Sequence, residues 1–354
     1  MFVLGAGFTR AFLPEAPLLV DHYKIDDLIE KYKVFPDVVN ILESEKNKIP
    51  DGRINIENLF TRVYNGMPYD SRHDVSALLL SDLKELFMQR LVQARKGVFH
   101  SNELGQFAKY CVENHITCIT FNYDDVLDQA LWEVKKLTQV SKGKEYWHPD
   151  GGYGFFCRPS ICCVTDTSVT MDVTAMHLLK LHGSVNWFVR FGSTVPYTID
   201  AIVHNEEWLT ITQSMGLLDL DEEMPFIREE ISGHLEKDPF IIPPVLDKSA
   251  IMGQPVFKLI WRLAYKALTA AQHIVFLGYS MPATDIASGF LFGEALKKLP
   301  VSNFKIVNHC NTEATQKDLE QAYRRVFPQI SLAQCEFVDA LEWVHGLASE
   351  VKSP

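Results

Sequence analysis

Five short apolar runs, each followed at once by glycine or by a small polar side chain, restrict the fold of this chain more than any other feature. The runs are rich in Leu, Phe and β-branched residues and lack clean alternation, which is typical of strands covered on both faces of a parallel sheet. They are Phe2–Leu4, Ile116–Phe121, Leu178–Leu181, Ile274–Leu277 and Phe304–Val307. Segments with helical spacing of apolar residues intervene at Asp125–Lys135, Val256–Ala271 and Asp285–Leu299. This alternation predicts an α/β fold built on a doubly wound parallel sheet of the Rossmann-like kind.

Three stretches interrupt the alternation. The chain has 354 residues, a length that fits either two compact units or one large domain with insertions; we expect a single Rossmann-like domain over residues 1–354. Within it, residues 26–93 are predicted to form a helical insertion. Residues 141–174, rich in Gly, Pro and aromatic side chains, are predicted to form loops and hairpins, and residues 193–237 an acidic insertion or lid.

The charge balance and the cysteines limit the partners and the compartment. The sequence holds 34 Lys and Arg against 45 Asp and Glu, a formal net charge of −11. Because it has no block of cations that could neutralise phosphates, we expect no direct binding of nucleic acid. The 7 cysteines are scattered without a C-x-x-C pair, so neither a zinc module nor a disulfide framework is indicated, and no metal is expected. The N-terminus lacks signal-peptide features and no apolar run approaches the roughly 18 residues of a membrane span, so we expect a cytoplasmic protein without membrane association.

The residues that follow the five apolar runs form the predicted site. In an open parallel sheet the carboxyl ends of all strands lie along one edge, and ligands bind there. The glycines and small or polar residues predicted at this edge are Gly5, Ala6, Gly7, Thr9, Asn122, Asp124, His182, Gly278, Ser280 and Asn308. Segments that are distant in the sequence thus meet at one crevice. Residues that only capped individual helices would not need to meet there.

The glycines of the first turn suit a phosphate-binding turn. Gly5-x-Gly7 follows a strand, and missing side chains let backbone amides approach a pyrophosphate. The third position of the usual fingerprint is Arg10, so the pattern equally fits a tight strand-to-helix turn; Thr9 or Arg10 could add phosphate contacts. Gly278 and Ser280 suit a second nucleotide contact, and Asn308 suits a ribose contact. The alternative is that these residues only form ordinary turns between a strand and a helix.

Two side chains of the predicted edge have catalytic capacity. Asn122 both donates and accepts hydrogen bonds, so it suits a ribose hydroxyl or a water. His182, followed by a glycine that keeps the approach open, suits a general base near neutral pH. Asp124 either recognises a carboxamide group or caps the following helix, which Asp125 could do instead. Asp285 is predicted to cap its helix rather than to take part in catalysis.

With these residues the chain resembles the sirtuin (silent information regulator) superfamily. "GAGFT" is similar to the first nucleotide loop of that family, "TFNYD" to its Gln-Asn-x-Asp region, "LHGS" to its catalytic His-Gly, "GYS" to its Gly-Thr/Ser-Ser turn, and "IVN" to its late adenosine-ribose strand. The motifs keep the family's order over most of the chain. The four-cysteine zinc module and the Phe-Gly-Glu substrate stretch are missing, "FIIPPVLDKS" (Phe240–Ser249) stands in place of the latter, and Phe121 replaces the family's glutamine.

Three further segments resemble the bacterial branch of zinc-free sirtuin-like NAD hydrolases: "FIIPP", a "W-x-x-A" helix at Trp261 and Ala264, and "FLGYSMPATD". The resemblance implies cleavage of NAD, as a substrate, at the nicotinamide–ribose bond to nicotinamide and ADP-ribose, in antiphage defence by abortive infection. It also implies a catalytic set of Asn122, His182 and Asp124, with Asp124 as the residue that could bind the carboxamide. Because an unrestrained NAD hydrolase would kill its host, we expect control by a homo-oligomer or a partner; within the branch, partners include DNA-translocase ATPases and short Argonaute proteins.

Three other functions fit the same residues. The crevice could bind NAD or ADP-ribose as a sensor without turnover, which would need the glycines but not Asn122 and His182 together. An NAD-dependent protein deacylase would need the substrate stretch that the chain lacks. A structural interaction subunit with a vestigial crevice would bind NAD only weakly, and so would gain little thermal stability from it.

Overall fold

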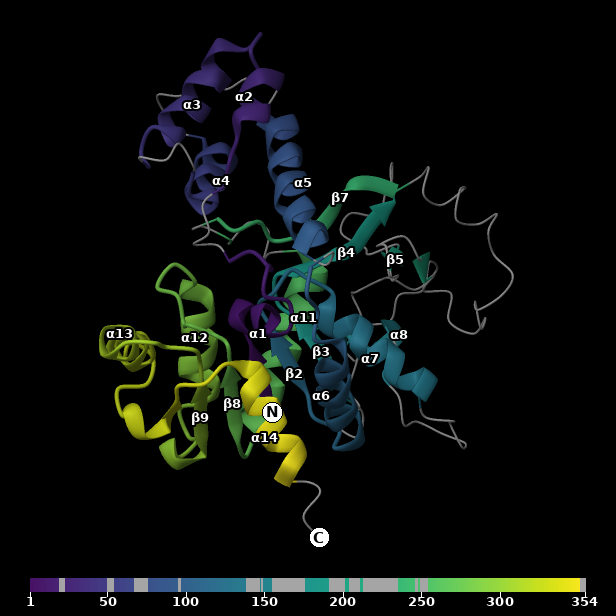
Figure 1. Ribbon diagram of the computed structural model, residues 1–354, viewed down its shortest axis with the longest axis vertical. Helices are drawn as coiled ribbons and strands as arrows, with labels where there is room; N and C mark the ends of the chain where they lie inside the picture. Colours follow the sequence, from purple (N-terminus) through teal and green to yellow (C-terminus); the bar gives the residue numbers. More distant parts are fainter. Residues whose placement is uncertain are drawn as a thin grey trace.

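A six-stranded parallel sheet lies at the centre of the molecule (Figure 1). The computed structural model describes residues 1–18, 23–49, 54–66, 76–94, 97–137, 147, 149–154, 176–190, 201–203, 211–212, 235–245, 248 and 254–350. The strands are β1 (Phe2–Leu4), β2 (Cys118–Thr120), β3 (Leu178–Lys180), β8 (Ile274–Leu277), β9 (Phe304–Val307) and β10 (Cys335–Glu336). All five apolar runs contribute strands, which confirms the predicted α/β Rossmann-like doubly wound sheet. Only the short edge strand β10 was not predicted.

The strand order β10-β9-β8-β1-β2-β3 determines where a ligand would bind. The chain moves outward from β1 through β2 to β3, returns to the other side of β1 at β8, and moves outward again to β10. Leu4 pairs with Thr120 on one side and with Leu277 on the other. The connections that leave the carboxyl ends of β1 and β8 therefore diverge, and the ligand crevice of such sheets lies at this switch point.

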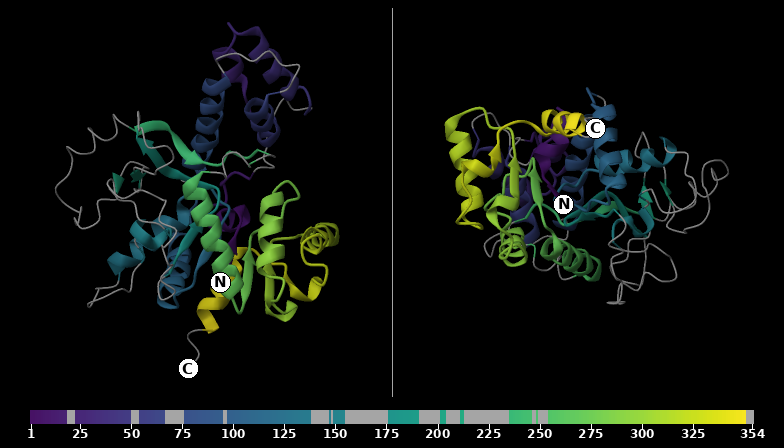
Figure 2. Two further views of the ribbon diagram at one scale, coloured as in Figure 1. Left: turned by 180° about the vertical axis from the view of Figure 1, so that it is seen from behind. Right: turned by 90° about the horizontal axis from the view of Figure 1, so that it is seen from below.

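Helices cover both faces of the sheet (Figure 2). One face carries α1 (Ala6–Phe12), α6 (Ser101–Glu113), α7 (Val126–Leu137) and α14 (Ala340–Glu350). The other face carries α11 (Pro255–Ala270) and α12 (Ile286–Ala295). Shorter or peripheral helices are α8 (Pro149–Gly152), α13 (Glu313–Arg324) and the 3-10 turns Val301–Asn303 and Leu332–Gln334. Among the helices that the structure describes, none is both long and apolar enough to cross a membrane.

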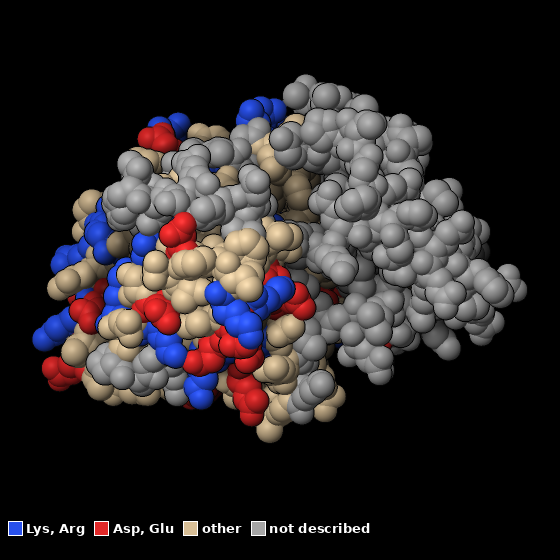
Figure 3. All heavy atoms as spheres, turned by 90° about the horizontal axis from the view of Figure 1, so that it is seen from above, with Lys and Arg blue, Asp and Glu red and all other residues tan. Residues whose placement is uncertain are grey.

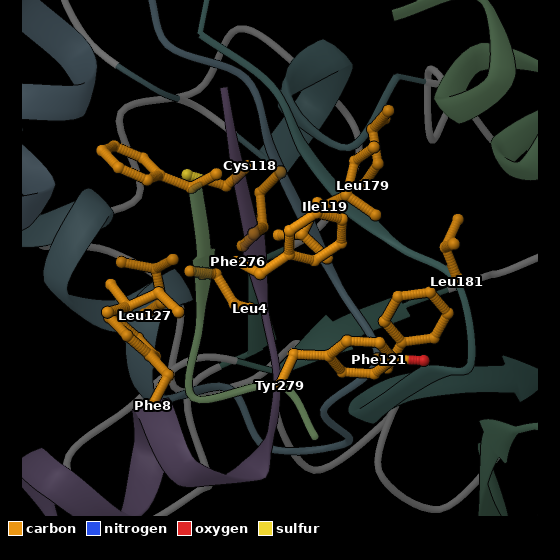
Figure 4. Packing of buried hydrophobic residues seen from close by; sticks show 14 of the residues in the cluster. Leu4, Phe8, Cys118, Ile119, Phe121, Leu127, Leu179, Leu181, Phe276 and Tyr279 are labelled. Atoms are coloured by element: carbon orange, nitrogen blue, oxygen red, sulfur yellow. The ribbon is translucent and has the colours of Figure 1, made fainter. Parts of the chain in front are cut away.

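The strands are continuous apolar runs in the sequence because they lie in a core between two layers of helices. Figure 4 shows Leu4, Ile119, Leu179 and Phe276 of four neighbouring strands packed side by side, and all belong to one buried cluster. Because helices cover both faces, all positions of β1, β2 and β3 are buried, whereas Val275 of β8 is partly buried and Lys305 of β9 is exposed. Each buried Leu or Phe side chain stabilises the fold by about 1.5–3 kcal/mol.

Four helices form a cap that stands beyond the carboxyl edge of the sheet, at the top of Figure 1. They are α2 (Asp26–Lys31), α3 (Pro36–Lys46), α4 (Ile56–Asn65) and α5 (Ser76–Ala94). The cap has its own apolar core, which also includes Tyr123, Val185, Ile241 and Val245 from segments near the sheet edge. The cap is therefore anchored where the site was predicted. On the described part of its outer face, acidic and basic side chains are interspersed rather than gathered by sign (Figure 3).

A small antiparallel sheet, which the sequence patterns did not predict, follows β3. Its order is β6-β5-β4-β7, with β4 (Gly183–Arg190), β5 (Ala201–Val203), β6 (Ile211–Thr212) and β7 (Leu235–Ile241). The predicted acidic insertion at 193–237 contributes β5, β6 and the start of β7, and its remainder lies outside the described residues. Most of the predicted loop insertion at 141–174 also lies outside them. Strand β4 begins directly after His182, so this sheet extends from the predicted site.

Candidate functional site

The turns that follow β1 and β8 pack directly against each other. The amide of Gly7 donates to the carbonyl oxygen of Gly278 at 2.9 Å. A Cβ on Gly5 would lie 2.5 Å from Cα of Tyr279, and a Cβ on Gly278, whose φ is +65°, would lie 2.1 Å from the amide nitrogen of Phe8. Contact between the two turns therefore requires these glycines, whether or not a phosphate binds beside them.

The other residues predicted to contact the nucleotide lie along the same edge. Ala6 and Ser280 are exposed. The side-chain amide of Asn308 donates to the carbonyl oxygen of Tyr279 at 3.4 Å, and the Gly278 amide donates to Val307 at 2.9 Å. The turns after β1, β8 and β9 thus form one continuous backbone surface at the switch point.

Asn122 joins the end of β2 to the first turn. Its Nδ2 donates to the carbonyl oxygen of Gly5 at 2.8 Å and to Oγ1 of Thr9 at 3.0 Å. Because a carbonyl only accepts, this contact fixes the orientation of the amide. Both amide hydrogens are thus used, and among the described residues none donates to Oδ1 of Asn122. That oxygen is the atom through which Asn122 can hold a hydroxyl group or a water.

Asp124 stabilises the same network. Its Oδ2 accepts from the Thr9 hydroxyl at 2.7 Å, and its Oδ1 accepts from the amide of Val126, the first residue of α7, at 3.1 Å. Burial raises the pKa of Asp124, against the opposing influence of Lys180 and the Thr9 hydroxyl. Of the two predicted roles for Asp124, the hydrogen bonds correspond to the structural one at the start of the helix.

A buried ion pair lies beneath this loop. The ammonium of Lys180 is fully buried in β3, pairs with Asp128 of α7 at 2.9 Å, and donates to the backbone oxygen of Asp124 at 2.5 Å. The hydroxyl of Tyr153 also donates to Asp128. The pair therefore ties the loop that carries Asn122 and Asp124 to two elements of the fold.

His182 follows the strand beside that of Asn122. Thr120 of β2 pairs with Lys180 of β3, and Asn122 and His182 each come two residues later. The loops remain adjacent beyond the strands, because the amide of Val185 donates to the carbonyl oxygen of Tyr123 at 2.9 Å. The structure thus brings Asn122 and His182 to neighbouring positions on the carboxyl edge.

Phe121 connects these groups to the turn after β8. Its ring centroid lies 5.3 Å from that of His182 and 4.8 Å from that of Tyr279, on which it stacks. Figure 4 shows Phe121 and Tyr279 side by side at one end of the sheet core. An aromatic residue at position 121 therefore fills the space between the strands and the predicted nucleotide turn.

The backbone around His182 is held on both sides. The indole Nε1 of Trp261 donates to the carbonyl oxygen of Leu181 at 2.9 Å, and the amide of Ile242 donates to that of His182 at 2.8 Å. A Cβ on Gly183, whose φ is +78°, would lie 2.2 Å from the carbonyl oxygen of Phe240. The segment "FIIPP" therefore contacts the backbone of the histidine directly, and the "W-x-x-A" helix contacts the residue before it.

Two charged residues that the sequence patterns did not assign to the site face His182. Nζ of Lys248 lies 3.4 Å from Nε2 of His182 and 3.2 Å from Oδ1 of Asp285, and Oδ2 of Asp285 lies 3.6 Å from the same Nε2. The exposed fractions are 5% for His182, 8% for Lys248 and 6% for Asp285. The only sequence signal for Lys248 is its place in the segment where the family's substrate stretch is missing.

The prediction that Asp285 caps its helix is wrong. Asp285 occupies the N-cap position of α12, but its side chain makes no capping hydrogen bond. Its carboxylate turns to Lys248 instead, because a buried ammonium needs a charged partner more than an exposed helix end needs a side-chain cap.

The local environment sets the protonation of this cluster. Burial, reinforced by Lys248, lowers the pKa of His182 to about 3, against the opposing influence of Asp285 and a hydrogen bond with the Phe121 backbone. The pKa of Asp285 is lowered although its burial acts in the opposite direction, because His182 and Lys248 lie beside it. At neutral pH, His182 is therefore an uncharged base beside an ionised carboxylate.

No protein-family model matches the chain, and no curated protein matches its sequence. The fold and the site define it as a Rossmann-like α/β protein whose carboxyl edge carries an amide, a neutral histidine and a buried ion pair. Within the described ranges, no group of three or more His, Cys, Asp or Glu side chains is placed to hold a metal ion.

Proposed function

We propose that this protein hydrolyses NAD at the nicotinamide–ribose bond, with nicotinamide and ADP-ribose as products. The observation that carries the proposal is the position of Asn122 and His182 on adjacent paired strands, next to the β1–β8 switch point. Dinucleotides bind in this place in sheets of the same order. The resemblance of the surrounding motifs to zinc-free sirtuin-like NAD hydrolases supplies the reaction.

In this reaction the oxygen of a water bonds to C1′ of the ribose while the bond from C1′ to the nicotinamide nitrogen breaks. The bonding electrons neutralise the cationic nicotinamide ring, so the leaving group needs no strong acid, and the transition state resembles an oxocarbenium ion. Oδ1 of Asn122 would orient the water or a ribose hydroxyl. Neutral His182 would accept the proton, a contribution worth about 10²–10⁴-fold in rate.

The remaining residues would position the substrate. The backbone of the turns after β1 and β8, with Gly5, Gly7 and Gly278, would lie along the pyrophosphate, and Asn308 would lie near the second ribose. Because both carboxylate oxygens of Asp124 already accept hydrogen bonds, we assign it to holding Thr9 and Asn122 rather than to binding the carboxamide. Such positioning lowers the entropic part of the barrier.

The proposal is tested by incubating the purified chain with NAD and measuring free nicotinamide and ADP-ribose, alone and with candidate partners. Asn122→Ala and His182→Ala are each expected to lower the rate by about 10²-fold or more. His345→Ala, at an exposed position of α14, is the matched control and should retain full activity. Turnover that persists in both site variants would overturn the residue assignments.

A sensor that binds NAD or ADP-ribose without turnover is the second candidate. The low exposure of Asn122 (9%) and His182 (5%) favours it, because a reacting ribose must reach both. Calorimetric binding of NAD without nicotinamide release, under every partner condition, would favour the sensor. Binding followed by release would favour the hydrolase.

In the cell, we propose that the protein acts in antiphage defence as a cytoplasmic homo-oligomer. A partner such as a DNA-translocase ATPase or a short Argonaute protein would control its activity. The motif resemblance supports this role. Its test is the NAD content of phage-infected cells that express the wild type or His182→Ala, with depletion expected only for the wild type.

A further inference from the structure

The groups around His182 come from separate parts of the chain. Lys248 follows the antiparallel sheet, Asp285 precedes α12, and Glu57 belongs to α4 of the cap. We propose that Lys248 is a positioning residue that directs the acceptor nitrogen of His182, that Asp285 holds Lys248 in place, and that Glu57 links both to the helical cap. Only the catalytic consequence depends on the proposed function, because the arrangement can be measured without NAD.

The geometry determines the tautomer of His182. An ammonium group can only donate, so at 3.4 Å from Nε2 the Lys248 ammonium faces a lone pair. In this arrangement the imidazole proton lies on Nδ1; the ring also has a hydrogen bond with the backbone of Phe121. Because two adjacent positive charges in a buried site are costly, His182 stays uncharged while Lys248 remains beside it.

Asp285 offers the Lys248 ammonium a second partner besides His182. Its carboxylate lies within reach of both side chains, 3.2 Å from Nζ of Lys248 and 3.6 Å from Nε2 of His182. If the ammonium turns from His182 toward Asp285, the lone pair of Nε2 becomes available to a proton from the substrate or from water. The same carboxylate would then stabilise the imidazolium that forms.

The cap contacts this cluster from two sides. Glu57 of α4 has a hydrogen bond with the side chain of Thr284, next to Asp285, and its pKa is raised by burial against the influence of Lys248. Phe87 of α5 packs edge-on against Tyr123 at 5.2 Å between ring centroids, and Tyr123 stacks on His182 at 5.7 Å. The phenol of Tyr279 also interacts with Asp285. A shift of the cap therefore changes the surroundings of both Lys248 and His182.

The test is ¹⁵N NMR of the full chain labelled at histidine, without substrate, with the His182 signals assigned from His182→Gln. In the wild type we expect a neutral ring with its proton on Nδ1 across about pH 5 to 8. Lys248→Met should move the titration of His182 upward toward the ordinary histidine range, because the repulsion from Lys248 is removed while the attraction to Asp285 remains. Asp285→Asn should leave His182 neutral over the whole range, and so should Lys248→Arg, which keeps the charge.

The controls separate this effect from general damage to the fold. Lys305→Met removes an exposed lysine of β9 that pairs with Glu336, and it should leave the His182 signals unchanged. A titration of His182 that moves upward in Lys248→Met but stays below this pH range in Asp285→Asn supports the proposal. Equal responses, or a proton on Nε2 in the wild type, overturn it.

The link to the cap has its own pair of variants. Glu57→Gln should change the chemical shifts of the His182 ring nitrogens, while Glu43→Gln, at an exposed position of α3, should not. Identical spectra for the two variants overturn the role of Glu57. Because no step uses NAD, a failure here is distinct from a failure to release nicotinamide.

Discussion

At the scale of single residues, burial gives His182 a lower pKa than an exposed histidine has. Its pKa in the folded protein is about 3, whereas the ordinary pKa of a histidine is 6.5. Between these two values the unfolded chain binds a proton at this position and the folded chain does not. Because stability rises with pH wherever the unfolded state binds more protons, this histidine stabilises the fold less as pH falls through 6.5 toward 3.

The expected result is a difference in pH dependence between the wild type and His182→Gln. On going from pH 7 to pH 5, the wild type should lose about 2 kcal/mol more unfolding free energy than the variant, at about 1.4 kcal/mol per pH unit below the unfolded pKa. Urea denaturation at both pH values measures this. His345→Gln should behave like the wild type, and an equal loss in His182→Gln would contradict the assignment.

Two glycines in different surroundings give a second prediction at this scale. Gly278→Ala places a Cβ 2.1 Å from the Phe8 amide at a φ of +65°, and we expect a loss of roughly 2–4 kcal/mol of unfolding free energy. Gly105→Ala, in α6 with nothing within 4 Å of the added Cβ, should instead gain about 0.5–1 kcal/mol, because alanine favours helix. Chemical denaturation compares them, and a gain at Gly278 would show that the two turns do not contact each other closely.

At the scale of secondary-structure elements, the buried pair of Lys180 and Asp128 connects β3 to α7. We expect Lys180→Met to lose roughly 3–5 kcal/mol of unfolding free energy, because it leaves the Asp128 carboxylate buried without its cation. Adding Asp128→Asn should restore part of the loss. In contrast, Lys297→Met breaks an exposed pair with Glu294 and should leave the stability almost unchanged, because solvent screens such a pair. Similar losses for the two lysine variants would contradict the claim that burial makes the Lys180–Asp128 pair more important for stability than an exposed pair.

The elements differ in how well the sequence predicts them. Five of the six strands of the parallel sheet were predicted to within a residue or two at either end, because each is a continuous apolar run. The antiparallel strands β4 and β7 carry mixed residues, and they pair across a long stretch of intervening chain. Such a sheet is defined by its pairing rather than by a local pattern, so it was not found.

At the scale of the whole molecule, the residues that the structure describes form two apolar clusters, one in the sheet layers and one in the cap. Phe87→Ala removes a ring from the cap cluster beside Tyr123, and we expect a loss of roughly 3–5 kcal/mol in the local stability of the cap. Hydrogen exchange should then show faster exchange in α2 to α5, with the amides of β1 and β8 still protected. Uniform loss of protection would show that the cap and the sheet unfold as one unit.

The sequence by itself determined the α/β class, the five central strands and the placement of Asn122 and His182 at their carboxyl ends. Those features follow from local apolar runs and from the rule that parallel strands end at one edge. Only the tertiary structure decided that Lys248 and Asp285 face His182, that Glu57 and Phe87 reach the same cluster from the cap, and that contact between two turns requires Gly5 and Gly278. Charge pairing and close packing depend on which segments meet in space, and no local pattern in this chain encodes those meetings.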